Sequence, residues 1–368
     1  MKILVVNTVS FELNGITAVI MNYFCNIEQE EIQMDFVVIN DICEKYRSEI
    51  EKRGSCIYQL PRNRRPVIYA KELFSILIKE KYNAIHIHGN SATMAIETVV
   101  AWLARIPVRI VHAHNTSCTY IKMHKILYPF FSTTYTHAFA CGDKAGKWLY
   151  KDKPFVVLRN GIDLKKYAYS QKTREIIRKQ LNVNEKVVIG HVGNFVSQKN
   201  HSFLLDVFAK LLKVDSRYCL LLIGDGPLME EMKKKAYLLG IQNQIIFLGR
   251  RNNVYEFLQA MDFFAFPSHY EGMPVALVEA QAAGLPSIVS DNVDKEADLT
   301  DSIRFISNED SKYWVDEIRV LTNKLYQYNR EEKCAEWQEK ISISGYDIET
   351  NAKVLKSLYF TYVKNKSK

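Results

Sequence analysis

The stretch DFFAFPSHYEGMPVALVEAQAAGLPSIVS, residues 262–290, has the pattern of a strand, a helix and a second strand in succession. The apolar runs 262–266 and 286–290 have the composition of buried strands. Pro274 suits the first turn of the helix between them, where a missing N–H costs nothing, and Gly284 suits its end. Strand, crossover helix and strand form the repeating unit of a parallel sheet.

The same alternation of apolar, β-branched runs with segments of helical period extends along the whole chain. The other expected strands are 2–8, 33–40, 56–60, 83–88, 108–113, 137–141, 155–159, 186–192, 218–223, 245–248 and 302–306. Because about thirteen strands are too many for one ordinary open sheet, the sequence predicts an α/β fold with two Rossmann-like domains.

A turn signal, Asn160-Gly161-Ile162-Asp163, followed by a polar stretch indicates the boundary between the two domains. We therefore expect an N-terminal domain over 1–165 and a C-terminal domain over 166–346, with a final helix at 347–364. In doubly wound sheets ligands bind beyond the carboxyl ends of the strands. The informative residues should then follow strands.

Composition describes a globular protein, with 368 residues of which 48% are hydrophobic and 24% charged. No apolar run approaches the roughly 20 residues of a membrane span, and the N-terminus is too quickly polar for a signal peptide. The seven cysteines are scattered without C-x-x-C spacing. This usage predicts free thiols in a cytoplasmic protein and argues against a disulfide or zinc framework.

The formal charge of +8 is concentrated in residues 53–153, which hold fifteen Lys and Arg against five Asp and Glu. This stretch includes the aromatic-basic segment YIKMHKILYPFF at 120–131. Basic residues interleaved with aromatic ones suit contact with an anionic membrane surface. An anionic acceptor, or a solvated basic face with the aromatics in the core, would give the same composition.

Two carboxylates lie eight positions apart on the quoted stretch, Glu271 before the helix and Glu279 about two turns further on. Backbone N–H groups at the start of a helix can bind an anion such as phosphate, and here they belong to Gly272, Met273, Val275 and Ala276. A phosphate site between two acidic hydrogen-bond acceptors suits a sugar nucleotide. A bare pair of glutamates with this spacing would instead indicate a surface helix.

The full string, Ser-x-x-Glu-Gly-x-Pro through Glu279 to Gly-x-Pro, resembles the E-x7-E signature of retaining glycosyltransferases of family 4, which have the GT-B fold. The resemblance implies two Rossmann-like domains with parallel sheets facing across a cleft, and a last helix that packs back on the N-terminal domain. It also implies that Glu279 accepts hydrogen bonds from the ribose and that Glu271 holds a hydroxyl of the donor sugar.

The stretch GHVGNFVSQKN, 190–200, places Lys199 after a strand and just before a helix. An ammonium there can stabilise a departing diphosphate. The family pattern is Gly-Arg-x-x-x-x-Lys, and Asn194 stands in the position of its Arg. Lys199 then carries more of the charge, or Asn194 donates a neutral hydrogen bond.

Gly224, in the run IGDGP at 223–227, resembles the family's strand-end turn near the nucleotide, and Arg250 follows the next strand. A dinucleotide fingerprint would need a third glycine where Met229 stands, so an NAD enzyme is not expected. Gly15 follows the first strand, where family members carry paired glycines. Asn14 replaces the other glycine and tolerates positive φ.

Two His-x-His strings, His86-Ile87-His88 and His112-Ala113-His114, end successive strands. Alternate residues share one face of a strand, so each pair could bind a metal, but no Cys or Glu lies at a supporting spacing and we expect none to be bound. The resemblance implies that His114 reaches the donor sugar and that His88 lines the acceptor side. His86 and His112 are expected to have structural roles.

The sequence contains no Asp-x-Asp, the motif with which glycosyltransferases of the other main fold hold a metal on the diphosphate. We therefore expect a metal-independent reaction without a cofactor. The expected catalytic residues are Glu271, His114 and Lys199, and the expected donor-binding residues are Gly15, Asn194, Lys199, Gly224, Arg250, Gly272, Met273, Pro274, Val275 and Glu279.

The predicted function is a retaining transfer of a sugar, from a UDP-sugar by family frequency, to a glycan or lipid-linked oligosaccharide at the inner face of a bacterial membrane, in capsule or exopolysaccharide synthesis. A GT-B-like sugar-nucleotide epimerase or a phosphorylase remains an alternative. A nucleic-acid-binding protein is disfavoured, because the aromatics lie in apolar periodic segments.

Overall fold

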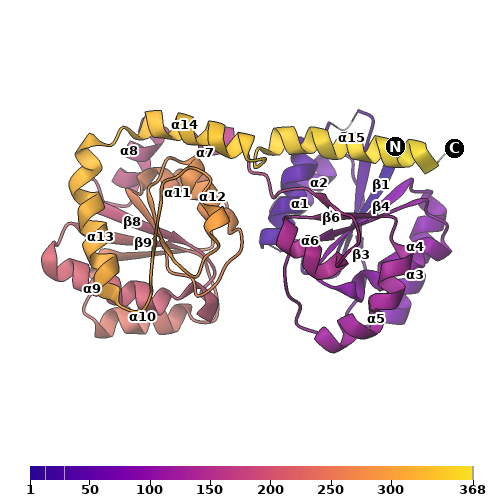
Figure 1. Ribbon diagram of the computed structural model, residues 1–368, viewed down its shortest axis with the longest axis horizontal. Helices are drawn as coiled ribbons and strands as arrows, with labels where there is room; N and C mark the ends of the chain where they lie inside the picture. The colour runs from indigo at the N-terminus through magenta and orange to yellow at the C-terminus, as the bar shows by residue number, and fades with distance from the viewer. Residues whose placement is uncertain (13, 29, 367–368) are drawn as a thin grey trace. The chain divides into compact units, whose positions relative to one another are not determined.

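The computed structural model describes residues 1–12, 14–28 and 30–366, and within them it contains thirteen strands, one at each expected position. The chain divides into two compact units. Unit 1 comprises Met1–Gly161 and Gly345–Lys368, and unit 2 comprises Ile162–Ser344. Each unit is a doubly wound parallel sheet, so the predicted pair of Rossmann-like folds is confirmed (Figure 1).

The sheet of unit 1 has the order β3-β2-β1-β4-β5-β6-β7, and all neighbours are parallel. Its strands are β1 Lys2–Asn7, β2 Gln33–Val38, β3 Ile57–Gln59, β4 Ala84–Gly89, β5 Val108–Ala113, β6 His137–Ala140 and β7 Val156–Val157. Its helices are α1 Gly15–Asn26, α2 Glu44–Lys52, α3 Pro66–Glu80, α4 Ala95–Leu103, α5 Ile121–Thr134, α6 Asp143–Tyr150 and α15 Ile348–Lys366, with the 3₁₀ turn η1 Ala92–Met94.

Helices cover both faces of this sheet, which explains why its strands are mostly apolar. Helices α1, α2 and α15 contribute to the core on one face, and α3, α4 and α6 to the core on the other. The chain-terminal helix α15 packs beside α1, as Figure 1 shows in yellow against indigo. The C-terminal helix thus completes the fold of the N-terminal unit.

The sheet of unit 2 has the order β10-β9-β8-β11-β12-β13, again parallel throughout. Its strands are β8 Val187–Val192, β9 Tyr218–Ile223, β10 Ile245–Gly249, β11 Phe263–Phe266, β12 Ser287–Ser290 and β13 Ile303–Ile306. Its helices are α7 Leu164–Tyr167, α8 Gln171–Gln180, α9 His201–Val214, α10 Met229–Leu238, α11 Val254–Ala260, α12 Val275–Ala282, α13 Ser311–Lys324 and α14 Arg330–Ile343, with the 3₁₀ turns η2 Ser197–Lys199, η3 Gln242–Gln244, η4 Lys295–Ala297 and η5 Leu325–Gln327.

Local sequence chemistry accounts for the helix ends next to the strands. Asn14 caps α1 by accepting a hydrogen bond from the Thr17 amide at 3.0 Å. Its φ is −135°, so the tolerance of asparagine for positive φ is not used here. Gly284 ends α12 at φ +67°, and the next amide, that of Leu285, bonds back to the Ala280 carbonyl at 3.0 Å.

All seven cysteines are free thiols, as expected from their spacing. Among the described residues, no helix combines the length and the hydropathy that crossing a bilayer requires.

Candidate donor site at the strand ends of unit 2

Glu271 and Glu279 both lie on the connection from β11 to β12. Glu271 precedes α12 and is held by its backbone, because its carbonyl accepts a hydrogen bond from the Asp294 amide at 3.0 Å. Pro274 directly precedes α12, whereas the sequence suggested that it lies in the first turn. The helix therefore begins one residue later than expected. Glu279 is therefore only the fifth residue of α12, little more than one turn from its start.

The start of α12 leaves backbone donors available. The amides of Gly272, Met273, Val275 and Ala276 make no hydrogen bond within the described part of the chain. The Pro274 side chain offers no cap, and the first turn of α12 contains no acidic residue. These groups and the positive end of the helix are arranged to attract an anion.

Lys199 and Glu271 form an ion pair across neighbouring strands. Lys199 ends the 3₁₀ turn η2 after β8, and its Nζ lies 2.7 Å from Glu271 Oε1 after β11. The two side chains are 18% and 15% exposed, so each still reaches solvent and can meet a ligand. The Lys199 ammonium also lies 4.5 Å from the centre of the Phe266 ring.

Gln198 is a contact that the sequence analysis missed, although it stands beside Lys199. Its Nε2 donates to Glu271 Oε1 at 3.0 Å and to the Tyr270 carbonyl at 3.0 Å. One oxygen of Glu271 thus receives two donors, and this fixes the direction in which its other oxygen points.

Glu279 has a second partner that no sequence pattern indicated. Tyr167 of α7 donates its hydroxyl to Glu279 Oε1 at 2.6 Å. Burial raises the pKa of Glu279 to about 7, and the tyrosine hydrogen bond acts in the opposite direction. The carboxyl group of Glu279 therefore changes charge close to neutral pH.

The turns after β8 and β9 approach each other so closely that only glycine fits. A Cβ on Gly224, whose φ is +145°, would lie 1.9 Å from the Gly193 carbonyl oxygen. Asn194 follows directly and is exposed, and so is Arg250 after β10. The strand ends of β8, β9 and β10 thereby present backbone and polar side chains at one edge of the sheet.

The other expected site residues lie in unit 1. Gly15 is the first residue of α1, after β1. His114 follows β5, and its Nε2 lies 2.9 Å from His88 Nδ1. His86 and His112 are buried in the sheet of unit 1, and the structural roles expected for them stay a prediction.

We expect the stability of unit 1 to be sensitive to acid because of four histidines, His86, His88, His112 and His114. Burial lowers the pKa of each, to about 3 for His114. Between the lowered pKa and the ordinary value near 6.5, the unfolded chain binds more protons than the folded chain, so stability falls as pH falls below about 6.5. Each histidine contributes up to about 1.4 kcal/mol per pH unit.

Hydrogen exchange at pH 7 and pH 5, with a chelator present, measures this effect. Amides of β4 and β5 should lose more protection at pH 5 than amides of β8 and β9, because unit 2 holds only two buried histidines of lowered pKa, His191 and His201, among the described residues. Equal losses in the two units would contradict the assignment.

Comparison with known proteins agrees with this architecture. Residues 173–330 match the family described as Glycosyl transferases group 1. The chain is 30% identical to the putative glycosyltransferase EpsF of Bacillus subtilis, over 94% of this chain and 93% of that protein. It is also 30% identical to the UDP-Gal:alpha-D-GlcNAc-diphosphoundecaprenol alpha-1,3-galactosyltransferase of Escherichia coli, over 80% and 79% of the two chains.

Among solved structures, Anabaena HepE in complex with UDP superposes with a TM-score of 0.78 and 16% identity, over 98% of this chain and 100% of that chain. This likeness confirms the GT-B fold. The 30% identity to EpsF over nearly all of both chains, with the family match at 173–330, shows that the chain belongs to the Glycosyl transferases group 1 family and is a glycosyltransferase.

Proposed function

We propose that the protein transfers a sugar from a UDP-sugar to a lipid-linked or other glycan acceptor, with retention of configuration at the anomeric carbon, in the synthesis of a bacterial surface polysaccharide. Two relatives support this choice by the activities that their names state. The Escherichia coli relative uses UDP-Gal and a diphosphoundecaprenol-linked acceptor, and a Campylobacter jejuni relative acts on another diphospho-undecaprenol glycan.

The observation that carries the proposal is the convergence of charge at the start of α12. Lys199 Nζ and the free amides of Gly272, Met273, Val275 and Ala276 supply positive charge and donors for a diphosphate. Glu271 accepts from a hydroxyl of the donor sugar through the oxygen that Lys199 and Gln198 leave free. Glu279 accepts from the ribose in place of Tyr167.

These groups stabilise the departing diphosphate. In the proposed reaction no metal ion takes part in the transfer. The acceptor hydroxyl then attacks from the side on which UDP leaves, and a phosphate oxygen takes its proton. Positioning and electrostatics supply most of the rate. His114 and Gly15 of unit 1 and Asn194, Gly224 and Arg250 of unit 2 remain predicted donor contacts.

A thermal-shift screen of UDP, other nucleotides and UDP-sugars, with and without EDTA, tests the donor assignment. A ligand that binds only the folded protein raises the melting temperature. We expect stabilisation by UDP and by one UDP-sugar that is equal with and without EDTA. Consumption of that UDP-sugar without an acceptor and without release of UDP would instead identify an epimerase.

The raised pKa of Glu279 predicts that nucleotide affinity depends on pH. The ionised carboxylate accepts the ribose hydrogen bonds, so the affinity for UDP should rise with pH through about 7 and level off above it. Removing the Tyr167 hydroxyl removes the partner that lowers this pKa. Calorimetric titration of Tyr167→Phe should therefore show the same rise at a higher pH, and an unshifted profile would contradict the coupling.

We further propose that unit 1 contacts an anionic membrane through α4 and α5. Tyr120, Ile126 and Phe130 are 71%, 63% and 59% exposed, so the aromatics of this segment do not all lie in the core. Trp102 and Leu103 at the end of the adjoining α4 are more than half exposed as well.

Exposed basic residues lie on the same two helices or directly beside them, namely Lys122, Lys125 and Arg105. Apolar and basic side chains together suit the interface of an anionic bilayer.

Flotation with vesicles tests this surface. The protein should float with vesicles that contain phosphatidylglycerol, and less so with neutral vesicles or at high salt. The double variant Ile126→Ser, Phe130→Ser should lose most of the binding. Leu238→Ser, which removes an 82% exposed leucine from unit 2, is the matched control and should float like the parent protein. Absence of flotation at low salt would remove the proposal.

A further inference from the structure

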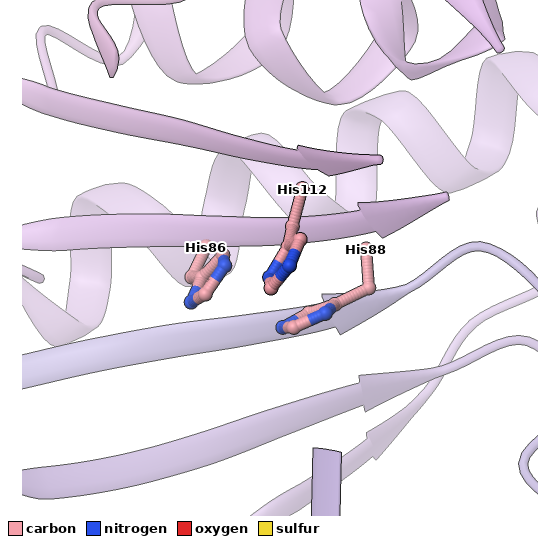
Figure 2. A group of neighbouring side chains, drawn as sticks. All are labelled: His86, His88 and His112. Atoms are coloured by element: carbon pink, nitrogen blue, oxygen red, sulfur yellow. The ribbon is translucent and has the colours of Figure 1, made fainter. Parts of the chain in front are cut away.

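Three histidines of unit 1 lie together on one face of the sheet. His88 on β4 is the register partner of His112 on β5, and His86 is two residues before His88. Because alternate residues share a face, all three side chains point to the same side. Figure 2 shows the three rings gathered below the two strands. Their ligand nitrogens all lie within 4.8 Å of one another.

The hydrogen bonds of these rings leave several ring nitrogens without a partner among the described residues. His86 Nδ1 lies 2.6 Å from the Tyr359 hydroxyl, and His88 Nδ1 lies 2.9 Å from His114 Nε2. A histidine that binds a metal through one ring nitrogen typically donates its other ring N–H to an acceptor, and the Tyr359 hydroxyl and His114 Nε2 can accept here. His86 Nε2 and both nitrogens of His112 are buried without a hydrogen-bond partner in the described part of the chain.

A small cavity borders all three histidines. Its volume is about 10 Å³, roughly the space that one water molecule needs. Residues of α1 and α15, among them Tyr23 and Tyr359, line its helix side, and apolar residues such as Val5 and Leu158 complete the lining. Room for a small ligand thus exists at the place where the free nitrogens are.

We propose that His86, His88 and His112 bind one Zn²⁺ ion, or a divalent ion with the same preference for imidazole, with water from the adjoining cavity as the fourth ligand. Three imidazoles and a water molecule form a familiar tetrahedral set for zinc. The ion would link β4 and β5 under α15, and the proposed sugar transfer assigns it no step.

Binding requires a local rearrangement that the structure permits. Zinc–nitrogen bonds of about 2.0–2.1 Å place tetrahedral ligand atoms about 3.3 Å apart, closer than the present spread. The His86 and His112 rings are nearly parallel, with an interplanar angle of 4°, so one ring must turn. His112 can turn without breaking a side-chain hydrogen bond. The nearby Leu158 backbone acts to raise the pKa of His112. It can accept a hydrogen bond from the ring N–H of His112 after the ring turns.

The protonation state favours metal binding at neutral pH. Burial lowers the pKa of His86, His88 and His112, and the neighbouring imidazoles lower it further. All three rings are therefore neutral at pH 7, and an ion can bind without displacing protons from them.

Titration of the full chain with Co²⁺, after removal of bound metal by a chelator, tests the site through the visible absorption of four-coordinate cobalt. The expected result is one ion per chain, displaced by Zn²⁺, with a higher melting temperature of the metal-bound protein. His112→Gln should weaken binding by at least about 100-fold. His269→Gln, which removes an exposed histidine, is the matched control and should bind like the parent protein.

A second variant keeps the test decisive if His112→Gln does not fold. Tyr359→Phe keeps the packing of α15 but removes the oxygen beside His86 Nδ1, and should weaken binding about 10–100-fold. Tyr362→Phe, on the same helix, is its control. No four-coordinate cobalt spectrum, or equal binding by the parent protein, His112→Gln and Tyr359→Phe, would overturn the proposal.

Discussion

Glu271→Gln should lower the rate of sugar transfer by about 10²–10³-fold while leaving the affinity for UDP unchanged or slightly higher. The variant keeps the shape of the side chain but removes the carboxylate that orients the donor sugar. It also frees the Lys199 ammonium, now 2.7 Å from Glu271 Oε1, to interact with the diphosphate. Binding and catalysis should therefore separate.

Steady-state kinetics together with calorimetric titration of UDP measure this separation. Lys199→Met should behave differently and lower both the affinity for UDP and the rate of sugar transfer. The cation is then missing from the complex with bound donor and from the transition state. Glu309→Gln, an exposed glutamate of unit 2, is the matched control and should change neither quantity. A normal rate for Glu271→Gln would remove the central residue of the proposed site.

Gly224→Ala should destabilise unit 2 on the order of 3 kcal/mol. Its Cβ would lie 1.9 Å from the Gly193 carbonyl oxygen, and the φ of +145° is one that alanine rarely adopts. Relief of the contact would require the turns after β8 and β9 to separate. This is the edge of the sheet where the donor is proposed to bind, so UDP affinity should fall as well.

Gly240→Ala separates the backbone cost from the steric clash. Gly240 has a φ of +70°, and a Cβ there would meet no atom within 4 Å. Its substitution should cost only about 1–2 kcal/mol. Hydrogen exchange of β9 amides measures both variants. Similar losses of protection for Gly224→Ala and Gly240→Ala would show that the close approach of the two turns does not matter.

The fold was predictable from the sequence because its information is local. Most of the thirteen strands are predominantly apolar runs, and all thirteen were expected within a few residues. Parallel sheets with both faces covered make such strands apolar throughout. The strand order was not predicted, because spacing along the chain does not say which strands become neighbours.

Without the strand order, the sequence cannot show which side chains of distant segments meet. Lys199 meets Glu271 because β8 and β11 are adjacent in the sheet, although 72 residues separate the two side chains. Tyr167 reaches Glu279 from 112 positions away. The two His-x-His strings form one cluster only because β4 pairs with β5 in a register that aligns His88 with His112. The proposed metal site thus depends on a pairing that spacing did not show.

The central claim, that unit 2 binds a UDP-sugar for transfer, is tested most directly by measuring UDP release from a panel of UDP-sugars with a diphosphoundecaprenol-linked glycan as acceptor. We predict that one donor releases UDP, that release requires the acceptor, and that the product keeps the donor's anomeric configuration. No release from any UDP-sugar, or an inverted product, would contradict the account.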